Sequence, residues 1–155
     1  MPSFRTTRRV PFTAAEMFVL VADVERYPEF VPLCESLTVT SRSGTTDDGE
    51  IVATMGIGYK AIRERFTTRV RLSKSENLIV VQHVDGPFRR LENRWTFRDV
   101  AGGSDVGFEI DYEFRSIPLG LIMGAVFDKA FRRFAEAFEE RARAIYGARP
   151  GVLPA

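Results

Sequence analysis

Few residues of this chain have the type and spacing that chemistry requires. The 155-residue sequence contains one histidine, His83, and one cysteine, Cys34. A Ser-His-Asp triad or a zinc site would need partners that these two residues lack. No phosphate-binding glycine motif or acidic calcium loop is present. We therefore expect no catalytic residue set and no metal site, with catalysis guided by pocket shape and by Glu64, Asn93 and Tyr112 as a lesser alternative.

Polar side chains also fall on the apolar faces of two predicted strands. By alternation, Glu64 and Thr68 share the face of Phe66, and Asn93 shares the face of Trp95. A buried carboxylate costs several kcal/mol unless it is paired or neutralised, so a sealed core usually excludes one. Glu64 and Asn93 are therefore candidates for a polar spot in a cavity, where they would meet a carbonyl or hydroxyl group. The alternative is that Glu64 lies near a rim or pairs with Arg8 or Arg90.

The elements that would position these residues are mostly strands. Alternating apolar residues, separated by turns rich in Gly, Ser, Asn and Asp, predict seven strands. Their ranges are 3–10, 36–43, 50–58, 61–72, 78–84, 91–100 and 105–114. Two short helices follow the first strand. The first is capped by Thr13 with Glu16 in a capping box, and Asp23 is the candidate cap of the second, which runs through Tyr27.

A long helix is predicted to end the fold. It begins at Pro118, runs to Tyr146 and stops at Gly147, which makes it roughly 43 Å long. Its apolar residues recur at the spacing of an amphipathic helix. They are Leu119, Ile122, Met123, Val126, Phe127, Ala130, Phe131, Phe134, Phe138, Ala142 and Ile145.

This order of elements predicts an α+β fold in which a seven-stranded curved antiparallel sheet wraps around the long helix. A straight helix fills a curved sheet imperfectly, so a gap can persist between them, and apolar concavities of this kind often hold ligands. The expected lining is Phe66, Trp95, Phe97, Phe108 and Tyr112 from the sheet, and Phe127, Phe131 and Phe134 from the helix. A filled aromatic core is the alternative.

Composition limits the class of protein. Apolar residues make up 45% and charged residues 28%, and the formal net charge is +1, so no global field attracts nucleic acid or membrane. The first residues lack the apolar segment of a secretory signal, and no apolar run is long enough to span a bilayer. We expect one domain over 1–147 with a flexible tail over 148–155. We also expect a cytoplasmic protein, or one held peripherally at the inner membrane.

One local charge pattern stands out. The outward face of the strand at 61–72 carries Arg63, Arg65, Arg69 and Arg71, and no acidic partner for this row is evident. Most charge rows are merely solvated, but this one is basic enough to touch anionic lipid headgroups or RNA phosphates. By contrast, the outward acidic row Glu109, Asp111 and Glu113 is expected to be offset by Arg5 and Arg9 of the first strand.

Several segments together resemble the polyketide cyclase/START-like superfamily. Within it they are most similar to the coenzyme Q-binding START-domain family, which includes the RatA-type ribosome association toxins. The resemblance covers roughly residues 4–146. Its segments are 24–34 (VERYPEFVPLC), 66–70 (FTTRV), 86–91 (GPFRRL), 95–97 (WTF), 106–114 (VGFEIDYEF) and 137–142 (AFEERA).

The resemblance implies a helix-grip fold that binds ubiquinone, or a similar hydrophobic molecule, between sheet and helix in support of respiratory electron transport. No cofactor is required, although a ubiquinone-like lipid can be bound. For the toxin branch it implies association with the large ribosomal subunit and blocked subunit joining. DNA is not an expected partner, and a cyclase or aromatase activity is the lesser alternative. Tyr27, Phe30 and Leu33 would form a lid at the tunnel mouth, or would simply pack there.

Overall fold

The computed structural model describes residues 3–147, so the predicted tail over 148–155 lies outside the described residues. Seven strands form one antiparallel sheet in the order β1-β7-β6-β5-β4-β3-β2. The strands are β1 (Ser3–Val10), β2 (Cys34–Gly44), β3 (Asp48–Tyr59), β4 (Ile62–Ser73), β5 (Leu78–Asp85), β6 (Phe88–Val100) and β7 (Gly103–Phe114). The first strand lies beside the last, as predicted.

Strand limits differ from the prediction by up to three residues. The largest difference is at β6, which begins at Phe88 rather than Leu91. Phe88 pairs with Phe114 across a bulge that precedes Arg90. An extra residue of this kind breaks strict alternation, which is why the pattern alone missed the start of the strand.

The segment after β1 contains one α-helix, α1 (Ala14–Ala22), and one 3₁₀ helix, η1 (Val24–Glu29). The predicted capping box is confirmed, because the Thr13 hydroxyl accepts from the Glu16 N–H and the Glu16 carboxylate accepts from the Thr13 N–H. The prediction that the Asp23 side chain caps the second helix is wrong. Its side chain makes no capping hydrogen bond, because a tight 3₁₀ turn continues directly from α1.

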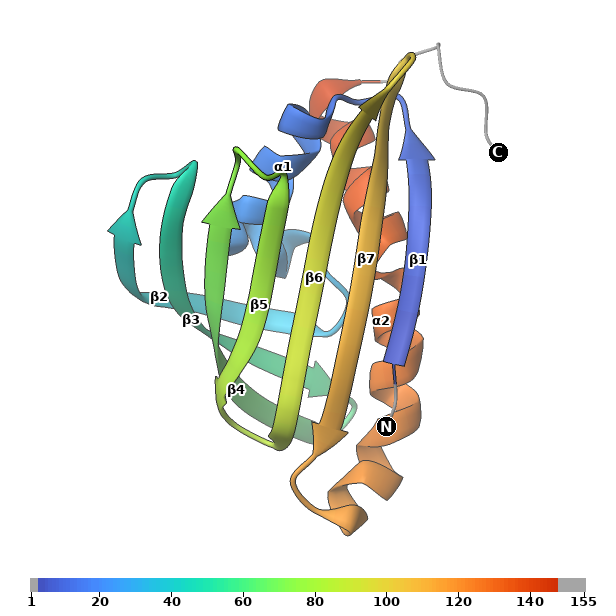
Figure 1. Cartoon of the computed structure of the whole chain (residues 1–155). Coiled ribbons are helices and arrows are strands. Elements are labelled where there is room, and N and C mark those ends of the chain that lie inside the picture. Colours follow the sequence, from blue (N-terminus) through green and yellow to red (C-terminus); the bar gives the residue numbers. More distant parts are fainter. Residues whose placement is uncertain (1–2, 148–155) are drawn as a thin grey trace.

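The long helix α2 (Ile117–Tyr146) begins at Ser116, whose hydroxyl accepts from the Leu119 N–H, and Gly147 caps its end. It packs on β1, β7 and α1, while β2, β3 and β4 form the strongly curved other half of the sheet (Figure 1). Ile122 and Ile145, predicted within its apolar stripe, are exposed. Ile122 lies about 140° around the helix from buried Phe127, and Ile145 lies in the last turn.

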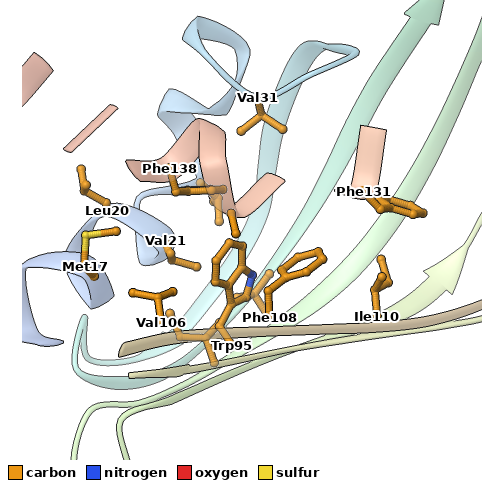
Figure 2. Packing of buried hydrophobic residues seen from close by; sticks show 14 of the residues in the cluster. Met17, Leu20, Val21, Val31, Trp95, Val106, Phe108, Ile110, Phe131 and Phe138 are labelled. Atoms are coloured by element: carbon orange, nitrogen blue, oxygen red, sulfur yellow. The ribbon is translucent and has the colours of Figure 1, made fainter. Parts of the chain in front are cut away.

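Aromatic rings fill much of the space between the sheet and α2. The Trp95 ring lies 4.9 Å from that of Phe138 on α2 and 4.8 Å from that of Phe108 on β7. Figure 2 shows these three side chains meeting near α1, with Phe131 and Ile110 farther along the same interior. Within the described residues, no helix is both long enough and apolar enough to cross a membrane.

Candidate functional site

A cavity of about 70 Å³ remains between α2 and the concave face of the sheet. That is room for a few water molecules, against roughly 300–1,000 Å³ for a typical small-molecule pocket. Its lining comes from β2–β7, η1, the loop after it and α2. The residues are Val24, Tyr27, Pro32, Leu33, Leu37, Ala53, Met55, Ile57, Phe66, Thr68, Val70, Val81, Leu91, Asn93, Trp95, Ile110, Phe127, Ala130, Phe131, Phe134 and Phe138.

The register of the sheet explains how one wall forms. Val70, Val81, Asn93 and Ile110 pair directly across β4, β5, β6 and β7, so their side chains point to the same face. Figure 2 shows Phe131 of α2 opposite Ile110 in this row. The cavity is therefore bounded by a cross-strand row on one side and by helix aromatics on the other.

Six of the predicted ligand-binding residues line the cavity, namely Phe66, Asn93, Trp95, Phe127, Phe131 and Phe134. Three others are buried behind the lining. The Phe97 ring packs 5.7 Å from that of Phe18 on α1, the Phe108 ring packs against Trp95, and the Tyr112 ring lies 5.0 Å from that of Phe131. These three position lining residues but do not face the space.

The tenth predicted residue, Glu64, is half-buried and lies outside the cavity lining. It shares the inner face with Phe66, as alternation required. However, β4 pairs with β5 only from Thr67 onward, so Glu64 lies on the part of β4 that extends past β5. Its position matches the rim alternative considered above.

Two other polar side chains face the cavity. Buried Asn93 donates from Nδ2 to the Glu109 carbonyl at 2.9 Å, and no group among the described residues donates to its Oδ1. The Thr68 side chain is buried and its hydroxyl has no hydrogen-bond partner among those residues, but a water molecule can still reach the oxygen. One acceptor and one hydroxyl are thus free to bind a polar group on an otherwise apolar ligand.

All of the lining residues on β2, β3 and β5 were missing from the predicted site. Leu37, Ala53, Met55 and Ile57 belong to the curled half of the sheet, and Val81 belongs to β5. The alternation of β3 already placed Ala53, Met55 and Ile57 on one face. A search weighted toward aromatic residues passed over them, although small and aliphatic side chains are what leave space open.

A lid segment (residues 24–33) closes one end of the cavity. Tyr27 and Leu33 line the space, and the Tyr27 hydroxyl donates to the Val21 carbonyl. Burial raises the pKa of Tyr27 well above its usual range. Leu33 has a φ of 69°, a left-handed conformation that is strained for a large side chain, and its carbonyl accepts from the Gly58 N–H at 3.0 Å.

The lid is also tied to α2 from outside. Glu29 accepts from Arg141 at 2.7 Å, and the Arg141 guanidinium lies 5.1 Å from the centre of the Phe30 ring. Phe30, the third predicted lid residue, packs on Phe138 rather than lining the cavity. The hydrogen bond from Arg141 lowers the pKa of Glu29, so this contact persists through neutral pH.

His83 and Cys34 are the remaining reactive side chains, and His83 is the direct cross-strand partner of Thr68. His83 Nε2 is buried without a hydrogen-bond partner among the described residues, and burial lowers the pKa of this imidazole. Burial raises the pKa of the Cys34 thiol to about 11. Both groups are therefore neutral near pH 7, and neither lines the cavity. No cluster of potential metal ligands occurs within residues 3–147.

The arginine row on β4 is exposed, but it is not free of acidic partners. Arg69 and Arg71 reach Glu50 at 3.0 and 3.5 Å, and Arg63 reaches Glu35 at 3.0 Å. The prediction that the row lacks acidic partners is therefore wrong for three of its four members. Glu50 lies directly opposite Arg71 in the register of β3 against β4, which the sequence pattern alone does not determine. Arg65 forms no ion pair with any described residue.

The acidic row of β7 is partly offset from β1, as predicted. Arg5 pairs with Glu109 at 2.8 Å in direct register. Arg9 instead binds Asp105 at 2.8 Å, and Arg98 of β6 binds the same carboxylate at 2.8 Å. Asp105 therefore links β7 to both of its neighbouring strands.

Comparisons with known proteins agree on a family. The family model described as "Polyketide cyclase / dehydrase and lipid transport" matches residues 10–139. The chain is 33% identical to "Ribosome association toxin RatA" of Escherichia coli K12, over 96% of this chain and 92% of that protein. It is 28% identical to "Coenzyme Q-binding protein COQ10 homolog B, mitochondrial" of Xenopus laevis, over 88% of this chain and 56% of that one.

Solved structures agree on the helix-grip fold. The Zhui aromatase/cyclase from a Streptomyces species superposes with a TM-score of 0.80, over 97% of this chain and 99% of that chain. Its sequence is 17% identical, so this likeness concerns the fold alone.

Proposed function

The chain belongs to the polyketide cyclase / dehydrase and lipid transport family, and from that premise we propose that it is a non-catalytic carrier of an isoprenoid lipid. The ligand class is a long apolar chain that ends in a carbonyl- or hydroxyl-bearing head group, as in ubiquinone. The lipid lies between the sheet and α2, and the protein supports respiratory electron transport by holding the quinone.

The observation that carries this proposal is the chemistry of the cavity lining. Apolar side chains surround the space, and Thr68 and Asn93 provide the free polar atoms. A carbonyl on the ligand accepts from the Thr68 hydroxyl, and a ligand hydroxyl donates to Asn93 Oδ1. A wholly apolar ligand would leave these polar groups without a partner, and a highly charged ligand would be buried among apolar walls without a counter-charge.

The size of the cavity implies that loading requires movement. At about 70 Å³ the space is far smaller than a quinone head group with even one isoprene unit. The lid segment is the element most able to move. Leu33 has a strained backbone conformation, and the ion pair of Arg141 with Glu29 lies at the surface, where such a contact contributes little to stability. The described conformation is therefore a closed one, and loading requires it to open.

The lining also lacks groups suited to acid–base catalysis near neutral pH. Burial keeps Tyr27 protonated, and neither Thr68 nor Asn93 titrates. General acid–base catalysis is most effective when the pKa of the group lies near the operating pH. These observations favour binding over turnover.

The experiment that tests the carrier proposal is solvent extraction of the purified native protein, followed by mass spectrometry. We expect an isoprenoid quinone in the extract of the wild type. Phe131→Asp, which places a carboxylate in the cavity wall, is expected to lose it. Ile145→Asp is the matched control, because residue 145 is an exposed apolar residue on the same helix. Absence of any lipid from the wild-type extract would contradict the proposal.

A second candidate function is association with the large ribosomal subunit. Identity to the ribosome association toxin over nearly the full length of both chains favours it. The arginine row supplies an exposed basic surface, with Arg65 unpaired and three other arginines sharing two carboxylates. Because these side chains lie on the outer face of the sheet, this function does not exclude occupation of the cavity.

A sedimentation experiment tests ribosome association separately from lipid binding. We expect the protein to pellet with purified large subunits, and we expect Arg65→Glu combined with Arg71→Glu to abolish pelleting by reversing charge opposite RNA phosphates. Lys129→Glu combined with Arg133→Glu, on α2, is the control with equal charge change. Unchanged pelleting of the β4 variant would remove the arginine row from this role.

A further inference from the structure

The first two turns of α2 expose more apolar surface than any comparable stretch of residues 3–147. Ile117 and Leu121 are each 81% exposed, and Ile122 is 61% exposed. The other large apolar side chains classed as exposed in these residues lie singly, and none exceeds 53%. Isolated exposed apolar residues are ordinary, whereas a cluster of this kind marks an interaction site.

This end of the helix is anchored and not frayed. The Leu119 N–H donates to the Ser116 hydroxyl at 3.2 Å, and the Arg115 N–H donates to the Pro87 carbonyl at 2.8 Å. On the inner side, Met123 is 2% exposed. The fold therefore holds Ile117, Leu121 and Ile122 outward on a fixed support.

The charges around the cluster are mainly positive. No acidic residue occurs from Arg115 to Phe127, and the next turns carry Lys129, Arg132 and Arg133 against the single carboxylate of Asp128. With Arg115 included, residues 115–133 carry four cationic side chains and one anionic side chain, a net charge of +3. Arg132 pairs with Asp128 at 3.0 Å, whereas Lys129 and Arg133 are exposed and form no ion pair with a described residue.

We propose that this helix end docks the molecule on a lipid bilayer that carries anionic headgroups. The α2 tip, defined as Ile117, Leu121 and Ile122, enters the interface, and the basic collar of Lys129 and Arg133 meets the headgroups. Lys129 lies about 12 Å along the axis from Leu121. Interfacial helices bury their apolar faces roughly 5–10 Å into the headgroup and acyl boundary, so the collar lies at the headgroup level.

The docking surface and the cavity share one helix. Phe127 and Phe131, which line the cavity, follow the tip within about three turns of α2. Docking therefore places the cavity next to a source of isoprenoid lipid. The proposal goes beyond the carrier function, since the surface binds membrane whether or not the cavity is loaded.

The test is co-sedimentation of the full chain with phosphatidylcholine vesicles, with and without phosphatidylglycerol. We expect binding to the anionic vesicles that weakens as salt is added. Leu121→Glu combined with Ile122→Glu is expected to lower binding about tenfold or more, because two buried apolar contacts are lost. Lys129→Glu combined with Arg133→Glu is expected to lower binding to anionic vesicles by at least about fivefold.

The matched control is Ile145→Glu, on the same helix about 36 Å from Leu121. Ile145 is 50% exposed, so the variant should fold and bind as the wild type does. The proposal is overturned if the wild type ignores anionic vesicles, or if Ile145→Glu lowers binding as much as the tip variant. It is also overturned if the tip variant loses binding to large ribosomal subunits while the wild type leaves vesicles unbound. Solvent extraction for quinone is independent of all these outcomes.

Discussion

Thr68 and Asn93 give the cavity its polarity, and they differ in what else they hold. The Asn93 amide also donates to β7, so its replacement would disturb the sheet. The Thr68 hydroxyl has no protein partner among residues 3–147 and can be removed cleanly. Thr68 is therefore the better residue with which to measure the contribution of head-group recognition.

Thr68→Val is expected to weaken binding of a short-chain ubiquinone about fivefold, the typical contribution of one neutral hydrogen bond. The free energy of unfolding should stay within about 0.5 kcal/mol of the wild type, because no hydrogen bond within the protein is lost. Isothermal titration and chemical denaturation measure the two quantities. Thr67→Val, on the outer face where its hydroxyl meets that of Thr54 at 2.8 Å, is the control and should bind normally. Equal affinity of both variants would contradict the role of Thr68.

Asp105 predicts how stability responds to acid. Its hydrogen bond with Arg9 lowers the pKa of this carboxyl to about 2, below the value of about 4 for an unfolded chain. A lowered folded-state pKa stabilises the fold fully above about pH 4, and this contribution is lost as pH falls toward about 2. We expect Asp105→Asn and Arg9→Met each to flatten the decline in unfolding free energy over that range, measured by urea denaturation. A decline as steep as that of the wild type in both variants would exclude this linkage.

Sequence reasoning at this scale found Asn93 and most of the aromatic lining because alternation fixes the face of each side chain. It could not place Glu64 outside the lining, since that depends on where β5 stops pairing with β4. It also found no carboxylates for the arginine row. Glu50 comes from the neighbouring strand β3 and Glu35 from β2, one strand farther away, and the register of these strands is a tertiary property.

At the scale of elements, the lid segment is the part whose movement the carrier proposal requires. It is attached inside through Tyr27 and Leu33 and outside through Glu29 and Arg141. The outer contact is exposed to solvent and therefore contributes little to stability. It can nevertheless slow opening, because the contact must break before Phe30 leaves Phe138.

Arg141→Ala is expected to speed release of bound ubiquinone several-fold while lowering the free energy of unfolding by less than about 1 kcal/mol. Stopped-flow exchange measures the release rate. Arg132→Ala is a closely matched control, because Arg132 also forms an ion pair, with Asp128 at 3.0 Å, and lies 4.7 Å from the Phe4 ring. Equal release rates in the two variants would show that Arg141 does not hold the lid.

The strands and helices themselves were predictable. Alternation, turn residues and the Thr13 capping box are local signals, and the structure confirms the order of the elements. The prediction of a side-chain cap at Asp23 was wrong because an aspartate before a helix usually caps it, whereas here a 3₁₀ helix follows α1 without a break. Whether a side chain caps depends on backbone geometry that the residue type does not determine.

For the whole molecule, the central feature is that α2 lies against β1 and β7, while β2, β3 and β4 form the strongly curved other half of the sheet (Figure 1). The space left between them depends on the degree of curl, which local sequence patterns do not encode. The sequence thus predicted a sheet wrapped on a helix, but it could not decide between a filled core and a cavity.

The space itself can be tested by filling it. Ala130 lines the cavity from α2, so Ala130→Leu adds three carbon atoms where room exists. We expect its free energy of unfolding to stay within about 1.5 kcal/mol of the wild type. Ala135→Leu, at a buried position outside the lining, should lose about 1–3 kcal/mol through overpacking. Thermal and urea denaturation make the comparison, and equal losses would indicate a solid interior.

The most direct measurement of ligand uptake uses Trp95, the single tryptophan of the chain, which is 2% exposed and lines the cavity. A quinone in contact with an excited indole quenches its fluorescence. Titration with short-chain ubiquinone should therefore quench the wild type saturably and leave Ala130→Leu unquenched, while Arg133→Asp behaves as the wild type. Absence of saturable quenching in the wild type, or the same curve for Ala130→Leu, would contradict the claim that the cavity between sheet and helix receives an isoprenoid quinone.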